Sequence, residues 1–128
     1  MIVGLGSDLV VIDRIERALN RFGEKFARRI LTDSEMQSWQ AGGKTAAWLA
    51  KRFAAKEAAL KALGTGLTQG INWHQIQTSH NAVGAPLIEF FDVAAKKLKS
   101  LGAETAWLTL TDEQNMAMAV VILEGSHK

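Results

Sequence analysis

The chain has 128 residues, 48% of them hydrophobic and 22% charged, which fits one globular domain over residues 1–128 and excludes a disordered protein. It contains no cysteine, which excludes disulfides and thiolate metal sites, and we expect a cytoplasmic protein. The net charge of +2 does not by itself indicate a nucleic-acid-binding protein, and no apolar run reaches the roughly 18 residues of a membrane span. The first residues carry no basic segment before their apolar stretch, so we expect no secretory signal.

Hydrophobic periodicity and turn residues predict an α+β fold, with a small, mostly antiparallel sheet packed with one long helix and several shorter helices. In chain order, we expect a strand over 1–12, a helix over 12–30 broken at Gly23, and a helix with Thr32 or Asp33 as its N-cap and Glu35 in its first turn. A long helix over 45–63, strands over 71–79 and 86–91, a helix over 92–102 and a hairpin over 105–124 follow. Gly64 stands where a glycine typically ends a helix, and Asp92 is the expected cap of the later helix.

Glu57 lies at the edge of the apolar face of the expected long helix. Leu49, Phe53 and Leu60 form the centre of that face, and Glu57 lies roughly 40° from Phe53 at about 100° per residue. One interpretation is a salt bridge with Lys61 at i+4, which is common on helices. The other is a functional carboxylate that faces the buried side.

Asp8 is a second carboxylate in an unexpected place, on the first expected strand. Strand alternation puts Gly4, Gly6 and Asp8 on one face. Glycine weakens a strand, so two glycines beside an aspartate indicate that another group approaches the backbone closely. Alternatively, Asp8 caps a turn and the glycines form a bulge.

Two inward-facing carboxylates together favour a cation site, because they repel each other unless a cation or a proton lies between them. Without cysteine and with only three histidines, an oxygen-liganded ion such as Mg²⁺ is the natural candidate. The basic residues near Glu57 and the "GTG" after them suit a phosphate-bearing ligand. The stretch is no Walker motif, since its glycines follow the helix.

Several segments carry a resemblance to one known family: "GLGSDLVVIDRIE", "RRILTDSE", "LAKRFAAKEAALKALGTG" and the terminal "LTLTDE" with "AMAVVILE". Over nearly its whole length the chain resembles the holo-[acyl-carrier-protein] synthases, the small 4′-phosphopantetheinyl transferases of bacterial fatty acid synthesis. The resemblance implies the phosphopantetheinyl transferase fold and transfer of 4′-phosphopantetheine from coenzyme A to a serine hydroxyl of apo-acyl carrier protein. It also implies adenosine 3′,5′-bisphosphate as the other product, dependence on Mg²⁺, and a homotrimer with active sites between neighbouring subunits.

The resemblance assigns roles to individual residues. Asp8 and Glu57 match the protein ligands of Mg²⁺, which in the family also binds the pyrophosphate of coenzyme A. The coenzyme-binding region is matched by Arg52, Lys56, Lys61, Gly64, Thr65 and Gly66. We expect Lys61 to act in catalysis with the two carboxylates, since fixed cations stabilise phosphoryl charge. Glu35 is a further candidate, for orienting the water that takes the serine proton; alternatively, it is a first-turn carboxylate favoured by the helix dipole.

Three positions depart from the family pattern. Trp107 stands where a histidine is common, Ala85 where the "G-K-P" turn has a lysine, and Met116 where an aromatic residue is frequent. Family members contact the nucleotide end of coenzyme A or the subunit interface there, and we expect Trp107 to be a core or trimer contact. The departures leave open a degenerate member, which would be a trimeric binding module for an acidic partner or an anionic ligand.

A basic stripe is expected on the helix over 12–30. Its members fall within about 80° of one another on a continuous helix: Arg14, Arg17, Arg21, Lys25 and Arg28. The stripe could bind nucleic acid or an anionic surface, or it could be a solvated face. The resemblance implies a third interpretation, docking of the acidic acyl carrier protein, and we expect this partner rather than nucleic acid or a membrane.

Overall fold

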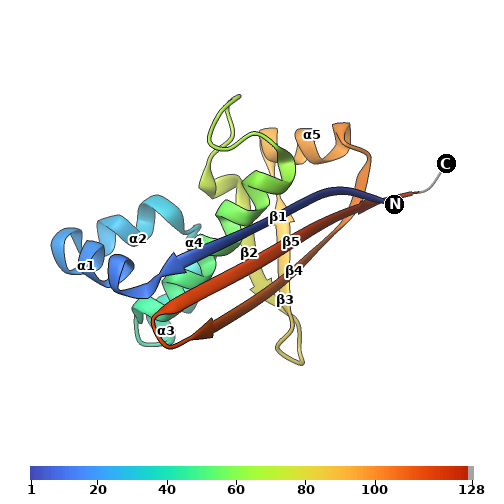
Figure 1. Ribbon diagram of the computed structural model, residues 1–128. Coiled ribbons are helices and arrows are strands. Elements are labelled where there is room, and N and C mark those ends of the chain that lie inside the picture. The colour runs from blue at the N-terminus through green and yellow to red at the C-terminus, as the bar shows by residue number, and fades with distance from the viewer. Residues whose placement is uncertain (127–128) are drawn as a thin grey trace.

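The computed structural model describes residues 1–126, which form two antiparallel sheets and five α-helices (Figure 1). The elements are β1 (Ile2–Val11), α1 (Ile12–Phe22), α2 (Glu24–Ile30), α3 (Asp33–Ala41), α4 (Ala46–Leu63), the short 3-10 helix η1 (Trp73–Gln75), β2 (Ile76–His80), β3 (Pro86–Phe90), α5 (Asp92–Ser100), β4 (Ala103–Glu113) and β5 (Met116–Gly125). One sheet has the order β1-β5-β4, and the other pairs β2 with β3. The predicted α+β class is confirmed.

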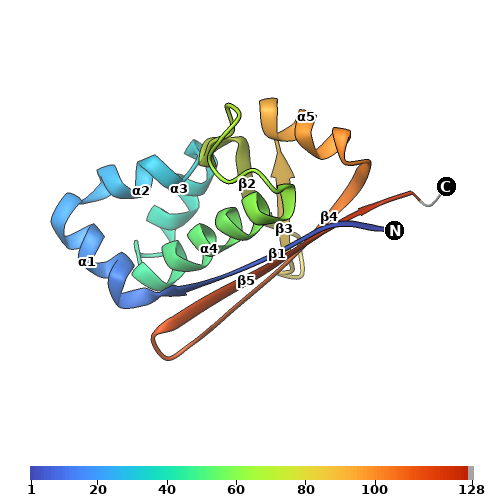
Figure 2. The same cartoon turned by 45° about the horizontal axis from the view of Figure 1, so that its top comes forward.

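Helix α4 is the centre of the core and lies along one face of the three-stranded sheet (Figure 2). Leu49, Ala54 and Leu60 are at most 1% exposed. Because β1 and β5 contact α4 on one side and α1 and β2 contact it elsewhere, its buried surface is wider than a single apolar stripe. Although α4 is long, no helix within residues 1–126 combines the length and the hydropathy needed to cross a membrane.

The helix ends follow from local chemistry, as the sequence predicts. Gly23 has φ 67° and separates α1 from α2. Thr32 caps α3 in a reciprocal capping box with Glu35. Thr45 caps α4 through its side chain, and Gly64, with φ 78°, ends it in the left-handed conformation.

Two expected elements need correction. The strand expected over 71–79 begins as η1, because the side chain of Asn72 accepts a hydrogen bond from the backbone N–H of His74 and fixes a turn there. Asp92 is the first residue of α5 and not its cap, which is Phe91 and makes no side-chain capping bond.

The glycine face of β1 packs directly on the backbone of α4. A side-chain carbon on Gly6 would lie 2.0 Å from the carbonyl oxygen of Ala58 and 2.7 Å from the nitrogen of Ala62. A side-chain carbon on Gly4 would lie 2.5 Å from the carbonyl oxygen of Ala62. The close approach expected from the glycines is therefore confirmed, and the neighbour is α4. The register of β1 on β5 also shifts between Ile2 and Gly4, so a bulge is present as well.

The opposite face of the three-stranded sheet is apolar and exposed. Leu5 is 65% exposed and Leu9 is 60% exposed, and both lie on the face of β1 that points away from α4. Leu5 pairs with Ile122, which pairs with Trp107, so the three side chains form a row across the sheet. Since Trp107 is 57% exposed, it is not a core residue of the single chain.

We expect Gly6→Ala to lower the free energy of unfolding by about 3 kcal/mol or more, because its new carbon would overlap backbone atoms that cannot move aside. Urea denaturation measures the effect. Gly42→Ala is the matched control, since its φ is −87° and the nearest atom to an added carbon is 3.2 Å away. The control should change stability by no more than about 1 kcal/mol. Equal losses in the two variants would contradict the proposed constraint at Gly6.

Candidate active site

The contact between β1 and α4 brings Asp8 to the helix. Gly4 lies against Ala62 and Gly6 against both Ala62 and Ala58, so the strand runs toward the N-terminal end of α4. Two residues of a strand span about 6.7 Å and four residues of a helix span about 6 Å. Every second residue of β1 therefore lies beside about every fourth residue of α4. Asp8, the next residue on this face of the strand, therefore lies beside the helical turn that precedes and includes Ala58.

Each of the two predicted metal ligands has one hydrogen-bonding side-chain partner: Lys61 for Asp8 and Trp73 for Glu57. The Lys61 ammonium donates to Asp8 Oδ1 at 3.0 Å and to the Ser7 carbonyl oxygen at 2.9 Å. Glu57 Oε2 accepts a hydrogen bond of 3.0 Å from the indole N–H of Trp73. Because Lys61 turns toward β1, the structure of residues 1–126 contains no Glu57–Lys61 salt bridge, and that interpretation is wrong.

The donor set at this position fits Mg²⁺. Asp8 and Glu57 come from different elements, and the Asp8 side chain is 17% exposed, so solvent and a ligand reach it. Among residues 1–126, no three histidine or acidic side chains converge in a way that could hold a metal. Mg²⁺ commonly binds one or two carboxylates and completes its shell with water and substrate phosphate, whereas an all-protein cage needs more ligands.

Lys56, which the resemblance assigns to coenzyme binding, lies in the core. It is 0% exposed, and its ammonium contacts Glu35 Oε1 at 2.6 Å and the carbonyl oxygens of Ile30 at 2.7 Å and Trp73 at 3.0 Å. Burial lowers the pKa of Lys56, and the charge of Glu35 opposes that shift. Since all three N–H donors are in use, we assign Lys56 to the fold.

Glu35, the candidate for orienting a water molecule, is also buried, with 1% exposure. One oxygen accepts from the Thr32 N–H in the capping box, and the other accepts from the N–H and the hydroxyl of Thr78 at 2.8 and 2.6 Å. These bonds and Lys56 occupy the carboxylate, which agrees with the alternative of a structural first-turn residue. The spacing T-x-x-E could have indicated the cap, whereas nothing in the sequence indicates the pairing with Lys56.

Arg52 is the buried cation with unused hydrogen-bonding capacity. It is 8% exposed, its guanidinium lies 4.7 Å from the Trp48 ring centre, and its Nε and Nη1 atoms have no hydrogen-bond partner within residues 1–126. Burial lowers the pKa of Arg52, and Glu35 raises it. The group lines a cavity of about 220 Å³ together with Ser34, Glu35, Ser38, Trp48, Thr78, Ser79 and His80, and the Glu35 carboxylate there is already paired with Lys56. Unpaired buried guanidinium nitrogens favour an anionic group in this cavity.

Arg52 and Glu57 lie on different sides of α4. Five helical residues turn the side chain by about 140°, so within one chain the Arg52 cavity is separate from the Asp8–Glu57 position. The structure therefore divides the three basic residues predicted to bind the coenzyme between these two places and the core.

The turn from Gly64 to Gly66 ends α4. Both glycines have positive φ, 78° and 59°, and Thr65 is 8% exposed, with its hydroxyl on the Gly66 carbonyl oxygen at 3.0 Å. The C-terminus of a helix carries partial negative charge and does not attract phosphate by itself. Lys61 in the last turn is therefore the group in this region that could bind one.

The basic stripe is interrupted at Gly23, where the sequence predicts a break, so its members do not share one continuous helix. Its five residues are all exposed, but Gly23 separates the three arginines of α1 from Lys25 and Arg28 of α2. Sequence periodicity also missed Arg29, which lines a groove of about 490 Å³ with Phe22, Lys25, Phe26 and Arg28. The basic surface is thus broader than a stripe and includes apolar side chains.

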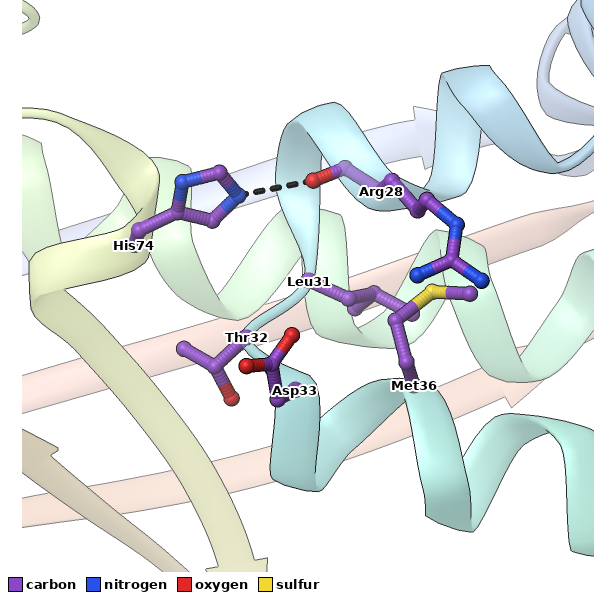
Figure 3. Close-up of a pocket in the computed structure, with 6 residues that line it drawn as sticks. All are labelled: Arg28, Leu31, Thr32, Asp33, Met36 and His74. Carbon is purple, nitrogen blue, oxygen red and sulfur yellow. Dashed lines mark hydrogen bonds between the residues drawn. The ribbon is translucent and has the colours of Figure 1, made fainter.

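Another cavity, of about 380 Å³, lies where α2, α3 and η1 meet (Figure 3). His74 reaches across it, and its Nε2 lies 2.7 Å from the carbonyl oxygen of Arg28. Since a carbonyl oxygen only accepts, Nε2 carries the proton. The remaining lining residues are Leu31, Thr32, Asp33 and Met36, so neither predicted metal ligand lines this cavity.

Comparisons with known proteins agree over nearly the whole chain. The family model of the 4′-phosphopantetheinyl transferase superfamily matches residues 4–121. A holo-[acyl-carrier-protein] synthase of Vibrio cholerae is 52% identical over 124 residues, which are 97% of this chain and 98% of that protein. The crystal structure of the Neisseria meningitidis synthase is similar with a TM-score of 0.89 at 40% identity, covering 97% of this chain and 99% of that one. The Helicobacter pylori synthase in complex with coenzyme A has a TM-score of 0.82 at 30% identity, covering 94% and 99%.

Proposed function

The chain belongs to the 4′-phosphopantetheinyl transferase superfamily, and we propose that it transfers 4′-phosphopantetheine from coenzyme A to a serine hydroxyl of apo-acyl carrier protein in fatty acid synthesis. The observation that carries the proposal is the β1–α4 contact, since Asp8 lies beside the helical turn before Ala58, which is the turn that contains Glu57. The non-catalytic alternative is not favoured, because the similar proteins are synthases over nearly their full length. An enzyme that uses coenzyme A and contains no cysteine suits the cytoplasm.

Asp8 and Glu57 would hold Mg²⁺, which neutralises charge on the coenzyme A pyrophosphate when bound. The serine oxygen attacks the β-phosphorus, the bond to adenosine 3′,5′-bisphosphate breaks, and the serine proton passes to a base. Because Glu35 is buried and occupied, the remaining bases are the carboxylates of Asp8 and Glu57 or solvent. Lys61 is 58% exposed on a flexible stem, so it can leave Asp8 and bind a phosphoryl oxygen that gains charge.

The Arg52 cavity is the second place for coenzyme A. Its unpaired guanidinium nitrogens and the surrounding hydroxyl groups suit a phosphate, which would compensate the buried positive charge. Ala85 and Trp107, which differ from the family pattern, do not line this cavity.

We expect Asp8→Asn and Glu57→Gln each to reduce turnover about 100-fold or more, because each keeps the side-chain shape and removes the charge that holds the cation. Mass spectrometry measures the gain of one phosphopantetheine by apo-acyl carrier protein with coenzyme A and Mg²⁺. Glu89→Gln, an exposed carboxylate on β3, is the matched control and should keep its activity. All three variants should have a thermal unfolding midpoint close to that of the unmodified protein. Near-normal turnover in either site variant would mean that the metal site is wrong.

We propose that the exposed sheet face forms a homotrimer. Besides the row of Leu5, Ile122 and Trp107, the face contains Leu9 beside Met118, which is 38% exposed. An apolar face of this extent typically marks an interaction site, and the number of three copies comes from the family resemblance.

We expect Leu9→Glu to produce monomers, because three copies would bury the new carboxylates on an apolar face. Light scattering at micromolar concentration measures the mass. Val83→Glu places the same charge on the tip of the β2–β3 turn, where the side chain is 88% exposed, and should stay trimeric. A monomeric unmodified protein with full activity would refute the trimer.

We propose that the basic surface of α1 and α2 receives the acidic carrier. We expect Arg14→Glu with Arg21→Glu to raise the KM for the carrier about tenfold and to leave coenzyme A affinity unchanged, because exposed charges act mainly on encounter. The effect should shrink at high salt. Lys96→Glu with Lys99→Glu on α5 changes the net charge equally and should leave the KM unaltered. Equal losses toward both substrates would argue against docking at α1.

A further inference from the structure

Trp73 connects the Glu57 carboxylate to the core through three residues of α4. Its indole N–H donates to Glu57 Oε2 at 3.0 Å. Its ring packs edge to face on Phe53, with ring centres 5.7 Å apart and planes at 64°. Its carbonyl oxygen accepts from the Lys56 ammonium at 3.0 Å. The indole is thus held at both its ring and its backbone.

The anchor of Trp73 is rigid because its partner is buried. Lys56 is 0% exposed and is itself fixed by Glu35 at 2.6 Å. Asn72 closes the turn on the other side by accepting from the N–H of His74 at 3.0 Å. A donor held in this way loses little conformational freedom when it binds a carboxylate. Its hydrogen bond therefore fixes the orientation of that carboxylate.

The chemistry of the donor matters as much as its position. Lys61 is occupied by Asp8, so the hydrogen bond that the structure gives to the Glu57 carboxylate comes from an uncharged group. An indole N–H orients a carboxylate without cancelling its charge. A lysine or an arginine in its place would compete with a cation for the same oxygens.

We propose that Trp73 is the positioning residue of the metal site: its indole N–H holds Oε2 of Glu57 and leaves Oε1, which would be the atom free to bind the cation. The proposal rests on the proposed function, in which Glu57 is a ligand of Mg²⁺. Groups that orient metal ligands typically change metal affinity or activity 10- to 100-fold when they are removed.

The test is Trp73→Phe, which keeps an aromatic ring against Phe53 and removes the N–H. Calorimetry measures coenzyme A binding with and without Mg²⁺. We expect the Mg²⁺-dependent gain in affinity to fall about tenfold, while affinity without Mg²⁺ stays unchanged.

Trp39→Phe is the matched control: Trp39 is 2% exposed and donates its indole N–H to the Thr45 carbonyl oxygen at 2.9 Å. It removes an equivalent hydrogen bond elsewhere and should keep the full gain.

A second measurement asks whether Trp73 acts through Glu57. In a Glu57→Gln background, Trp73→Phe should cause no further loss of the Mg²⁺-dependent gain, because the carboxylate that it positions is already gone. An unchanged gain in Trp73→Phe, or losses that add in the double variant, would overturn the positioning role. A complete lack of Mg²⁺ dependence in the unmodified protein would overturn the metal site as well, which separates the two failures.

The unmodified protein supplies a readout that does not depend on how the variant folds. The indole N–H resonance of Trp73, once assigned by NMR, should shift when Mg²⁺ and coenzyme A are added together, whereas that of Trp39 should not. A Trp73 resonance that stays in place would contradict the proposal.

Discussion

The close packing of β1 on the backbone of α4 is the constraint on which the candidate site depends. Gly4 and Gly6 leave no side chain between the two elements, and Ala58 and Ala62 complete the contact from the helix. Each glycine costs about 0.5–1 kcal/mol of strand stability relative to alanine. This close packing brings Asp8 of the strand beside the turn of α4 that contains Glu57, and bulkier side chains would hold the two elements apart.

Burial separates two lysines of α4 that the sequence pattern treats alike. Lys56 is 0% exposed and bound to Glu35, whereas Lys61 is 58% exposed and bound to Asp8. Breaking a buried pair costs about 3–5 kcal/mol, because it leaves a charge without compensation in the core. An exposed pair contributes at most about 1 kcal/mol. Lys61 can therefore exchange partners during a reaction, and Lys56 serves as a fixed point for η1 and α3.

Local features of the sequence predict the helix boundaries and the positions of the two carboxylates. Gly23, Thr32 and Gly64 act through their own backbone or their nearest neighbours, so pattern and propensity suffice there. The start of β2 was mispredicted because a single Asn72 side chain competes with the strand. Glu57 stood out by helical periodicity, yet its partner could not be predicted.

Contacts between distant segments account for most of what the sequence could not predict. The partner of Glu57 is Trp73, and the burial of Lys56 depends on Ile30 and Glu35, which belong to other helices. Periodicity on one helix carries no information about such neighbours. The basic stripe was incomplete for a different reason: the sequence predicts the break at Gly23 but does not specify by how much the helix direction changes there.

The junction between β1 and α1 links the two proposed substrate sites. Asp8 lies near the end of β1, and Arg14 lies in the first turns of the helix that follows directly. The β4–β5 turn holds this junction: the carbonyl oxygen of Asn115 accepts from the N–H of Ile12 at 2.8 Å, and its side chain accepts from the N–H of Asp13 at 2.9 Å. A carrier docked on α1 would thus bind a surface with a fixed distance to Asp8, the proposed metal ligand on β1. Because positioning supplies much of the acceleration in phosphoryl transfer, a rigid junction serves the reaction better than a flexible one.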